Sequence, residues 1–250
     1  MTRILRIDAS GTTEVEDALA VEEPLEIRVN DKPVSVTLRT PGDDFDLAAG
    51  FLFTESILRD ASDVESFRHW GSPNVVRVGL REGVRVDLAR LQRNFYSASS
   101  CGVCGKASID AVRVHTTPLD APLSVPREVI VSLPDQLRAQ QKTFDATGAI
   151  HGAGLFSADG TLLRMREDVG RHNAVDKVIG SFFREGESLA GRILVVSGRA
   201  SFEIVQKAIV ARIPVLAAVG APSTLAVELA RELRLTLYGF VRGERFNQYA

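Results

Sequence analysis

The chain has little of what crosslinks a protein or anchors it in a membrane. Its 250 residues include two cysteines, four histidines and one tryptophan. The longest apolar run, "IPVLAAVGA", is far shorter than the roughly 20 residues of a membrane-spanning helix, and it contains Pro214. The N-terminal stretch turns acidic where a secretory signal would need an apolar core. We therefore expect a cytoplasmic protein that does not bind membranes.

An excess of charge of one sign is also missing. The 30 Lys and Arg residues nearly balance the 32 Asp and Glu residues, leaving a net charge of −2. This balance argues against a general nucleic-acid surface. An apolar fraction of 45% and a charged fraction of 25% are typical of a soluble globular protein, and the length suffices for a full core.

Ligands for a structural zinc ion are too few. Zinc needs about four of them, and a cytosolic CxxC pair usually finds a second pair of Cys or His elsewhere. The sequence has no second CxxC. Its four histidines are His69, His115, His151 and His172, and no two of them are spaced as a ligand pair. We therefore expect no metal site.

The first half alternates apolar and polar residues, as strands do. "PLEIRVN" and "PVSVTLRT" predict a hairpin, and "NVVRVGL" with "VRVDL" predicts a second one around Arg81 to Gly83. "FDLAAGFLFTESIL" predicts a helix between them. "HTTPLDAPLSVPRE" carries three prolines and is the best candidate for a linker. We predict a smaller β-rich N-terminal lobe over residues 1–117, ending in the CxxC loop, and an α/β domain over residues 118–250.

The second half alternates helices and strands. "PDQLRAQQKTF" predicts a helix capped by Ser132, "GAGLFS" and "TLLRMRE" predict a hairpin about an Asp-Gly turn, and "DVGRHNAVDKVIGSFF" predicts an amphipathic helix. Three near-continuous apolar strands follow, "RILVVSG", "PVLAAVG" and "TLYGFVRG", separated by amphipathic helices. Such strands are typical of a buried, largely parallel sheet, so the fold class is α/β with three layers around a mixed sheet.

Polar, glycine-containing stretches follow each of these three strands. Ligands of open α/β sheets gather at the carboxyl ends of parallel strands, helix N-termini suit phosphates, and two arginines can clamp a phosphate. We therefore predict a pocket for an anionic, phosphorylated small molecule, although serines and arginines at such positions also serve as ordinary caps and solvated charges. Its candidate residues are Ser197, Gly198, Arg199 and Ser201 after the first strand, Ser223 and Thr224 after the second, and Arg242 and Arg245 after the third.

A second polar cluster surrounds "TGAIHGAG" and "REDVGRHNAVDK". His172 and Asp176 are four residues apart on a predicted helix, so the carboxylate is expected to orient the imidazole. His151 lies between glycines at the start of a strand. Asp168 is either a site residue or a helix N-cap. Lys177 is either a member of this cluster or a solvent-facing charge.

The two cysteines, Cys101 and Cys104, lie in the glycine- and serine-rich stretch "YSASSCGVCGKAS", which predicts a loop. A thioredoxin-like site would need a strand-to-helix junction, and the preceding "NFYSASS" is weak as a strand. Lys106, Arg93 and the glycine amides would favour a reactive thiolate. Such a thiolate suits sulfur relay through a persulfide or dithiol redox chemistry, and the residues alone do not separate the two.

Six segments stand out as motifs: "RTPGDDFDLAAGFLFTE", "SSCGVCGK", "TGAIHGAG", "EDVGRHNAVDKVIG", "SGRASFEIVQKA" and "GFVRGERFN". Together they resemble the formate dehydrogenase accessory sulfurtransferase family (FdhD), and the resemblance extends from about Pro24 to Tyr249. The resemblance implies an enzyme, a sulfurtransferase that accepts sulfur from a cysteine desulfurase. It passes this sulfur to the molybdenum or tungsten bis-guanine-dinucleotide cofactor, as its substrate, before formate dehydrogenase receives it.

By the same resemblance, Cys101 carries the persulfide and Cys104 is the helper thiol. The segment Phe240, Val241, Arg242, Gly243, Glu244 and Arg245 matches the family's cofactor-binding segment. We expect His172 to join that pocket with Ser197, Gly198, Arg199 and Ser201, and GDP to mimic the cofactor's nucleotide. The family also implies a cytidine-deaminase-like larger lobe, without the deaminases' H-x-E motif, and a homodimer. Two alternatives remain, a dithiol–disulfide oxidoreductase and a non-enzymatic cofactor chaperone.

Overall fold

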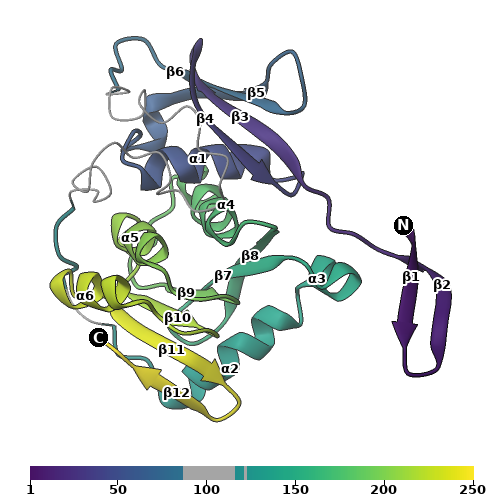
Figure 1. Cartoon of the computed structure of the whole chain (residues 1–250). Coiled ribbons are helices and arrows are strands. Elements are labelled where there is room, and N and C mark those ends of the chain that lie inside the picture. The colour runs from purple at the N-terminus through teal and green to yellow at the C-terminus, as the bar shows by residue number, and fades with distance from the viewer. Residues whose placement is uncertain (87–115, 121–122) are drawn as a thin grey trace.

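The computed structural model describes residues 1–86, 116–120 and 123–250 of the chain. These residues form a larger lobe around a six-stranded sheet, a smaller lobe around a four-stranded sheet, and a separate two-stranded hairpin (Figure 1). Cys101 and Cys104 lie outside the described residues, so their predicted loop and roles stay predictions.

The larger sheet has the strand order β12-β11-β10-β9-β7-β8. Its three central strands, β9, β10 and β11, run parallel, while β7, β8 and β12 are antiparallel to their neighbours. The mixed, largely parallel sheet that the sequence predicts is therefore confirmed. The strands span β7 (His151–Phe156), β8 (Leu162–Asp168), β9 (Ile193–Val196), β10 (Val215–Ala218), β11 (Thr236–Arg242) and β12 (Arg245–Gln248).

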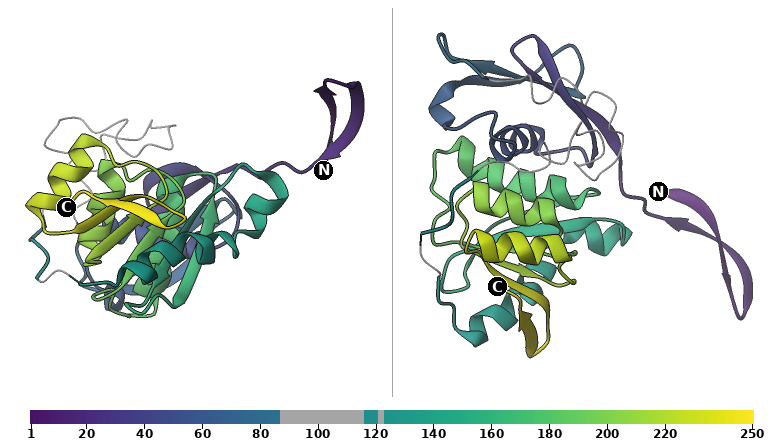
Figure 2. Two further views of the ribbon diagram at one scale, coloured as in Figure 1. Left: turned by 90° about the horizontal axis from the view of Figure 1, so that it is seen from below. Right: turned by 60° about the vertical axis from the view of Figure 1, so that its left-hand side comes forward.

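Helices cover both faces of this sheet because successive strand residues point to opposite sides. Leu194 and Val196 of β9 pack under α4, α5 and α6, whereas Ile193 and Val195 pack under α2 on the other face. Figure 2 shows helices on both sides of the sheet. The result is the predicted three-layer arrangement. The helices span α2 (Arg127–Arg138), α3 (Lys142–Thr147), α4 (Arg171–Arg184), α5 (Phe202–Val210) and α6 (Thr224–Glu232).

The smaller lobe consists of a sheet with the order β4-β3-β6-β5 and helix α1 (Asp44–Thr54) against one of its faces. The inner residues of its strands, such as Leu25, Ile27 and Val78, are buried against α1. The predicted hairpin around Asp31 and Lys32 is confirmed. The strands are β3 (Glu23–Val29), β4 (Lys32–Arg39), β5 (Val64–His69) and β6 (Val75–Leu80), with a short 3-10 helix, η1 (Ala61–Asp63), before β5.

The two lobes meet where α1 crosses α4 with almost no space between the backbones. A Cβ atom added at Gly50 would lie 1.9 Å from the Asp176 carbonyl oxygen, and one added at Gly180 would lie 1.9 Å from that of Asp46. Only glycine permits this approach. Beside the crossing, the buried Lys207 ammonium bonds Asp176 at 2.8 Å and Thr54 Oγ1 at 2.9 Å, which ties α5, α4 and α1 together.

The second hairpin predicted in the first half is wrong. β6 pairs with β3 on one side and with β5 on the other, so neither of its edges is free for the "VRVDL" segment. Val84 and Val86 instead pack against the core of the smaller lobe. The weak alternation of β5, "VESFRH", concealed the true partner.

The predicted start of the first helix in the larger lobe is also wrong. α2 begins at Arg127, contains Pro134 in its interior and ends at Arg138, and a break separates it from α3. Ser132 is no cap, since its hydroxyl donates to the Val129 carbonyl at 2.8 Å. The apolar face of Ile130, Leu133 and Leu137 is buried on the sheet, and this packing outweighs the usual preference of proline for a first turn.

Part of the predicted linker packs onto the larger lobe. Leu119 is buried in the core under α4 to α6, and its N–H donates to the Leu233 carbonyl at 2.9 Å. The hairpin of β1 (Thr2–Asp8) and β2 (Gly11–Asp17) was not predicted, and it extends away from the body (Figures 1 and 2). Among the described helices, none is long and apolar enough to cross a membrane.

Candidate functional site

The loops that follow β9 and β10 lie side by side at the carboxyl edge of the large sheet. The Gly220 N–H donates to the Gly198 carbonyl at 3.0 Å, and the Ala200 N–H donates to the Ala221 carbonyl at 3.2 Å. A Cβ atom at Gly220 would lie 3.0 Å from the Gly198 carbonyl oxygen, so a side chain there would require the neighbouring backbone to shift by a few tenths of an ångström. Because β9 and β10 are parallel, the structure brings together two of the three predicted stretches, residues 197–201 and 219–224.

The third stretch reaches this edge through one residue. The Phe240 N–H donates to the Gly220 carbonyl at 3.1 Å, and Phe240 has a positive φ of 54° at a bulge between β11 and β12. Val241 is fully buried against α2, so only its backbone groups remain for a ligand. Arg242, Gly243, Glu244 and Arg245 form the exposed tip of the β11–β12 hairpin, where Arg127 donates to the Glu244 carbonyl.

His172 is placed by two residues of the α5 start. It lies in the first turn of α4, and its Nε2 is 3.0 Å from the Ser201 hydroxyl and 3.3 Å from Glu203 Oε2. The Ser201 hydroxyl therefore contacts the imidazole and does not cap its own helix. Burial opposes ionisation of Glu203, but the hydrogen bond and charge of His172 outweigh it and lower the pKa of Glu203 to about 2.

The sequence-based partner of His172 is thus wrong. Asp176 is on the same helix, but its carboxylate turns toward α1 and α5, where it bonds Lys207 and Thr54. Glu203, which lies on α5, orients the His172 imidazole instead. No sequence spacing indicates this pair, because His172 and Glu203 are 31 residues apart on different helices. They meet only when α4 and α5 pack on the same face of the sheet. The signal that existed was the capping position of Ser201 beside an acidic first turn.

His151 and Arg171 complete this corner. The ring of His151 is close to Gly198, since a Cβ atom there would lie 3.5 Å from its Nδ1 and 4.0 Å from the Arg171 Cδ. Burial, followed by the charges of Arg171 and His172, lowers the pKa of His151, so its imidazole is neutral at pH 7. The Arg171 Nε is buried and has no hydrogen-bond partner within the described part of the chain.

Chemically, this corner can receive an anion. It combines the N-terminal end of α5, which carries the positive end of the helix dipole, a guanidinium nitrogen of Arg171 without a partner in the described residues, and the exposed side chain of Arg199. A phosphate oxygen at the Arg171 Nε would satisfy a buried donor that otherwise costs free energy. Arg171 belonged to the cluster noted in the sequence but was not singled out there.

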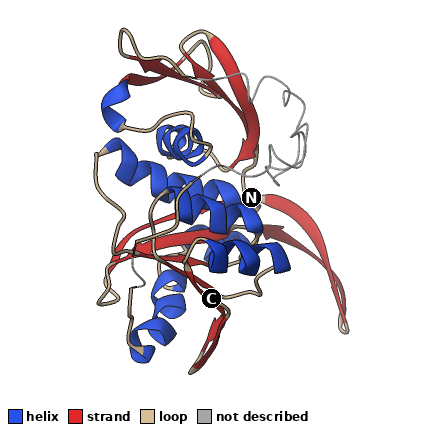
Figure 3. Ribbon diagram, turned by 90° about the vertical axis from the view of Figure 1, so that its left-hand side faces the viewer, coloured by secondary structure: helices blue, strands red, loops and turns tan. Residues whose placement is uncertain are grey.

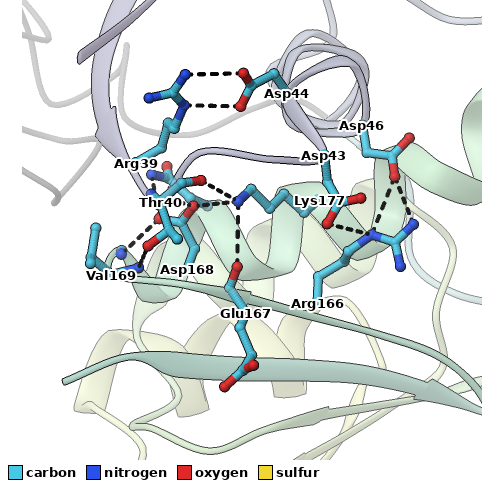
Figure 4. Close-up of polar contacts among 12 residues, drawn as sticks. Arg39, Thr40, Asp43, Asp44, Asp46, Arg166, Glu167, Asp168, Val169 and Lys177 are labelled. Carbon is cyan, nitrogen blue, oxygen red and sulfur yellow. Dashed lines mark hydrogen bonds and ion pairs between the residues drawn. The ribbon is translucent and has the colours of Figure 1, made fainter. Parts of the chain in front are cut away.

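Asp168 and Lys177 have a structural role. The Lys177 Nζ lies 2.7 Å from Asp168 Oδ2 and donates to the Thr40 carbonyl at 2.8 Å, and both charged side chains are almost completely buried (Figure 4). Asp168 also accepts hydrogen bonds from the N–H groups of Thr40 and Gly170. Lys177 is therefore not solvent-facing, and the cluster fixes the β8–α4 turn, just before His172, to the chain that leaves β4.

A second buried set surrounds it in the smaller lobe. Arg39 forms a two-pronged pair with Asp44, at 2.9 and 3.0 Å, and Arg166 bonds Asp46 (Figure 4). The Arg166–Asp46 pair connects the two lobes, whereas the Arg39–Asp44 pair ties β4 to α1 within the smaller lobe. Among the residues described, no group of three His, Cys, Asp or Glu side chains gathers to hold a metal ion.

Comparison with known proteins gives consistent similarities. The model of the FdhD/NarQ family matches residues 20–250. The chain is 50% identical over an alignment of 263 residues to a protein of Streptomyces coelicolor called "Sulfur carrier protein FdhD", covering 99% of this chain and 92% of the relative. It is 48% identical to a Mycobacterium tuberculosis protein of the same name, over 99% of this chain and 95% of the relative.

A solved structure shares the fold. A crystal structure from Desulfotalea psychrophila, whose protein is described as a candidate formate dehydrogenase accessory protein, superposes with a TM-score of 0.78 at 27% identity. It covers 100% of this chain and 95% of that chain.

Proposed function

Because this chain belongs to the FdhD/NarQ family, whose relatives are named sulfur carrier proteins, we propose that it is a sulfurtransferase for formate dehydrogenase maturation. Its donor is a cysteine desulfurase, and its acceptor is the molybdenum or tungsten bis-guanine-dinucleotide cofactor, which is the substrate. The observation that carries the acceptor half is the anion-receiving corner of Arg171 and the strand-end loops. A phosphorylated nucleotide is what those donors suit.

The sulfur step uses Cys101 and Cys104, which lie outside the described residues, and it is proposed on the family resemblance. The Cys101 thiolate attacks the terminal sulfur of the desulfurase persulfide, forms a new S–S bond and releases the desulfurase cysteine as a thiolate. Cys101 then holds the persulfide until the acceptor takes its terminal sulfur. Cys104 is the helper thiol.

The residues of the described corner divide the work of binding. One phosphate group is bound at the start of α5. It is faced there by Ser197, Gly198 and Arg199 and by the Arg171 guanidinium. The ionised Glu203 carboxylate holds His172 against Ser201 and fixes the direction of its ring. The exposed tip from Arg242 to Arg245 extends from the same end of β11, where two arginines offer charge to a second phosphate.

Three finer properties belong to the same proposal. The larger lobe has the cytidine-deaminase fold, which its helix–hairpin–helix–strand order supports. The chain works as a homodimer in the cytoplasm. It does no zinc hydrolysis, since the deaminases' H-x-E motif is missing from the sequence.

Intact-mass measurement tests the sulfur step. The protein is incubated with a cysteine desulfurase and cysteine and weighed before and after reductant. We expect a reductant-sensitive gain of one or more sulfur atoms in the wild type and in Cys104→Ala, and no gain in Cys101→Ala. Formation of an internal disulfide alone would instead support the oxidoreductase, and an unchanged mass in every variant would support the cofactor chaperone.

GDP binding tests the acceptor half separately. Titration calorimetry on the wild type and on Arg245→Ala should show weaker binding in the variant. Unchanged affinity would remove the C-terminal tip from the pocket.

A further inference from the structure

The hairpin of β1 and β2, called the arm here, has little to stabilise it within its own copy. Its two strands form a two-stranded sheet of their own, and it projects away from both lobes (Figures 1 and 2). A lone two-stranded hairpin is marginally stable in water. The arm also carries exposed apolar side chains: Leu5 is 66% and Ile7 is 75% exposed.

One face of the arm combines an apolar stripe with an acidic stripe. In the register of the hairpin, Leu5 is opposite Glu14 and Arg3 is opposite Glu16. Side chains two residues apart point to the same face, so Leu5 and Ile7 of β1 lie beside Glu14 and Glu16 of β2 on that face. Arg3 shares the face and lies 3.8 Å from Glu14, so the two carboxylates exceed the one guanidinium group there. A surface that covers it should be apolar on one side and basic on the other.

The outer face of the four-stranded sheet has a row of arginines. Arg28 of β3 is opposite Arg77 of β6, which is opposite Arg68 of β5. Like charges directly opposite one another destabilise a sheet, so this row requires compensation. Among the described residues, Glu26 pairs with Arg28 at 2.8 Å and Asp31 pairs with Arg77 at 3.1 Å, and no ion pair is seen for Arg68.

The same outer face has an apolar stripe next to the arginine row. Val36 of β4 is opposite Glu26, which places Val36 and Leu38 outside, and they are 50% and 37% exposed. Trp70, after β5, is 46% exposed and contacts the guanidinium groups of Arg77 and Arg68 at 4.5 and 5.2 Å from its ring centroid. Of the described helices, α1 lies against the inner face and none lies over the outer one (Figure 3).

We propose that the arm of one copy of this chain lies on the outer face of the four-stranded sheet of a second copy. Leu5 and Ile7 then cover Val36 and Leu38, and Glu14 and Glu16 approach the row of Arg28, Arg77 and Arg68. The apolar stripes and the charges of the two surfaces are complementary. In a single copy each surface leaves its apolar side chains exposed to solvent.

A second copy is the occupant because the arm points away from its own sheet (Figure 2). When each copy gives one arm and receives one, the contact is made twice and the pair closes with two-fold symmetry. The inference names the contact behind the proposed dimer and is independent of sulfur chemistry. A chain that takes up sulfur but stays monomeric would overturn the arm exchange and leave sulfur carriage intact.

A charge-swap experiment tests the exchange. Light-scattering mass is measured after gel filtration for the wild type, for Glu14→Arg/Glu16→Arg, for Arg28→Glu/Arg68→Glu, and for an equal mixture of the two variants. We expect a dimeric wild type and two monomeric variants, because each variant sets like charges against each other. The mixture should regain the dimer mass, since each arm then meets a sheet of opposite charge.

Two controls keep the test decisive. Glu187→Arg/Glu228→Arg makes the same change of charge at exposed sites elsewhere and should stay dimeric. If Arg28→Glu/Arg68→Glu does not fold, deletion of residues 1–19, which lie before the part matched by the family model, should yield a folded monomer. A monomeric wild type, including one whose sheet face binds an acidic segment of another protein, would overturn the proposal. A dimer that survives Glu14→Arg/Glu16→Arg or the deletion would do the same.

Discussion

Helix α4 carries two polar regions that differ in what they leave unsatisfied. Toward the smaller lobe, the side chains of Lys177 and Asp168 are at most 1% exposed. They bond one another and nearby backbone groups. Toward the strand-end loops, His172 is held by Ser201 and Glu203, while Arg171 keeps a buried nitrogen without a partner in the described chain. A closed network stabilises the junction of the lobes, and an open one has capacity for a ligand.

The largest effect should come from opening the closed network. Lys177→Met leaves the Asp168 carboxylate buried without its cation, which should lower the free energy of unfolding by about 3–5 kcal/mol. Urea denaturation measures it, with the exposed Lys142→Met as a matched control that should change stability by under about 0.5 kcal/mol. Equal stability of both variants would show that the Lys177–Asp168 pair does not support the fold.

The next effect concerns the helix crossing beneath that network. Gly180→Ala places a Cβ 1.9 Å from the Asp46 carbonyl oxygen, so α1 and α4 must separate. We expect a loss of about 1–3 kcal/mol in unfolding free energy, as for other overpacked cores. Ser181→Ala, one residue further along, adds no atom and should cost less. A Gly180→Ala protein as stable as the wild type would contradict the close crossing.

The third effect appears as a pH dependence. The pKa of Glu203 is lowered from 4.5 to about 2 in the folded chain, so its stabilising contribution is present above pH 4.5 and is lost as the pH falls toward 2. Glu203→Gln removes this dependence. Unfolding free energies should differ by about 1–2 kcal/mol at pH 7, given the partial exposure of the site, and converge at low pH. A difference that stays constant from pH 7 to pH 2.5 would contradict the ionised pair.

The smallest effect on stability, and the sharpest on function, should come from the open network. Arg171→Gln should weaken GDP binding roughly tenfold, about 1.4 kcal/mol, with an unfolding free energy within about 0.5 kcal/mol of the wild type. Arg192→Gln is the matched control: its Nε is also buried without a partner in the described chain, but Arg192 precedes β9 at the opposite edge of the sheet. Equal GDP affinities in the two variants would remove Arg171 from the site.

Local pattern was enough wherever one periodicity dominated. The three apolar strands and the helix with Val175, Val178, Ile179 and Phe182 on its buried face lie where the sequence predicts them. Pattern failed where a tertiary partner decided the outcome. β5 took the edge of β6 that "VRVDL" was predicted to fill, and packing on the sheet kept Pro134 inside a helix.

The site shows the same division. That residues 197–201 and 219–224 share the carboxyl edge of the sheet follows from the order of strands and helices, because parallel neighbours end at the same edge. The partners of α4 do not follow from that order. Asp176 and Glu203 are both carboxylates within reach of this helix, but the α1–α4 crossing turns Asp176 to Lys207 and leaves His172 to Glu203.

The sequence by itself therefore determined the layers, the edge of the sheet where phosphate-binding loops gather, and the family resemblance. Only the tertiary structure decided which charges are used up within the fold and which remain for a ligand. The reason is physical: periodicity and strand order are local or repetitive properties, whereas the pairing of a buried charge depends on which side chains from distant segments share its desolvated surroundings.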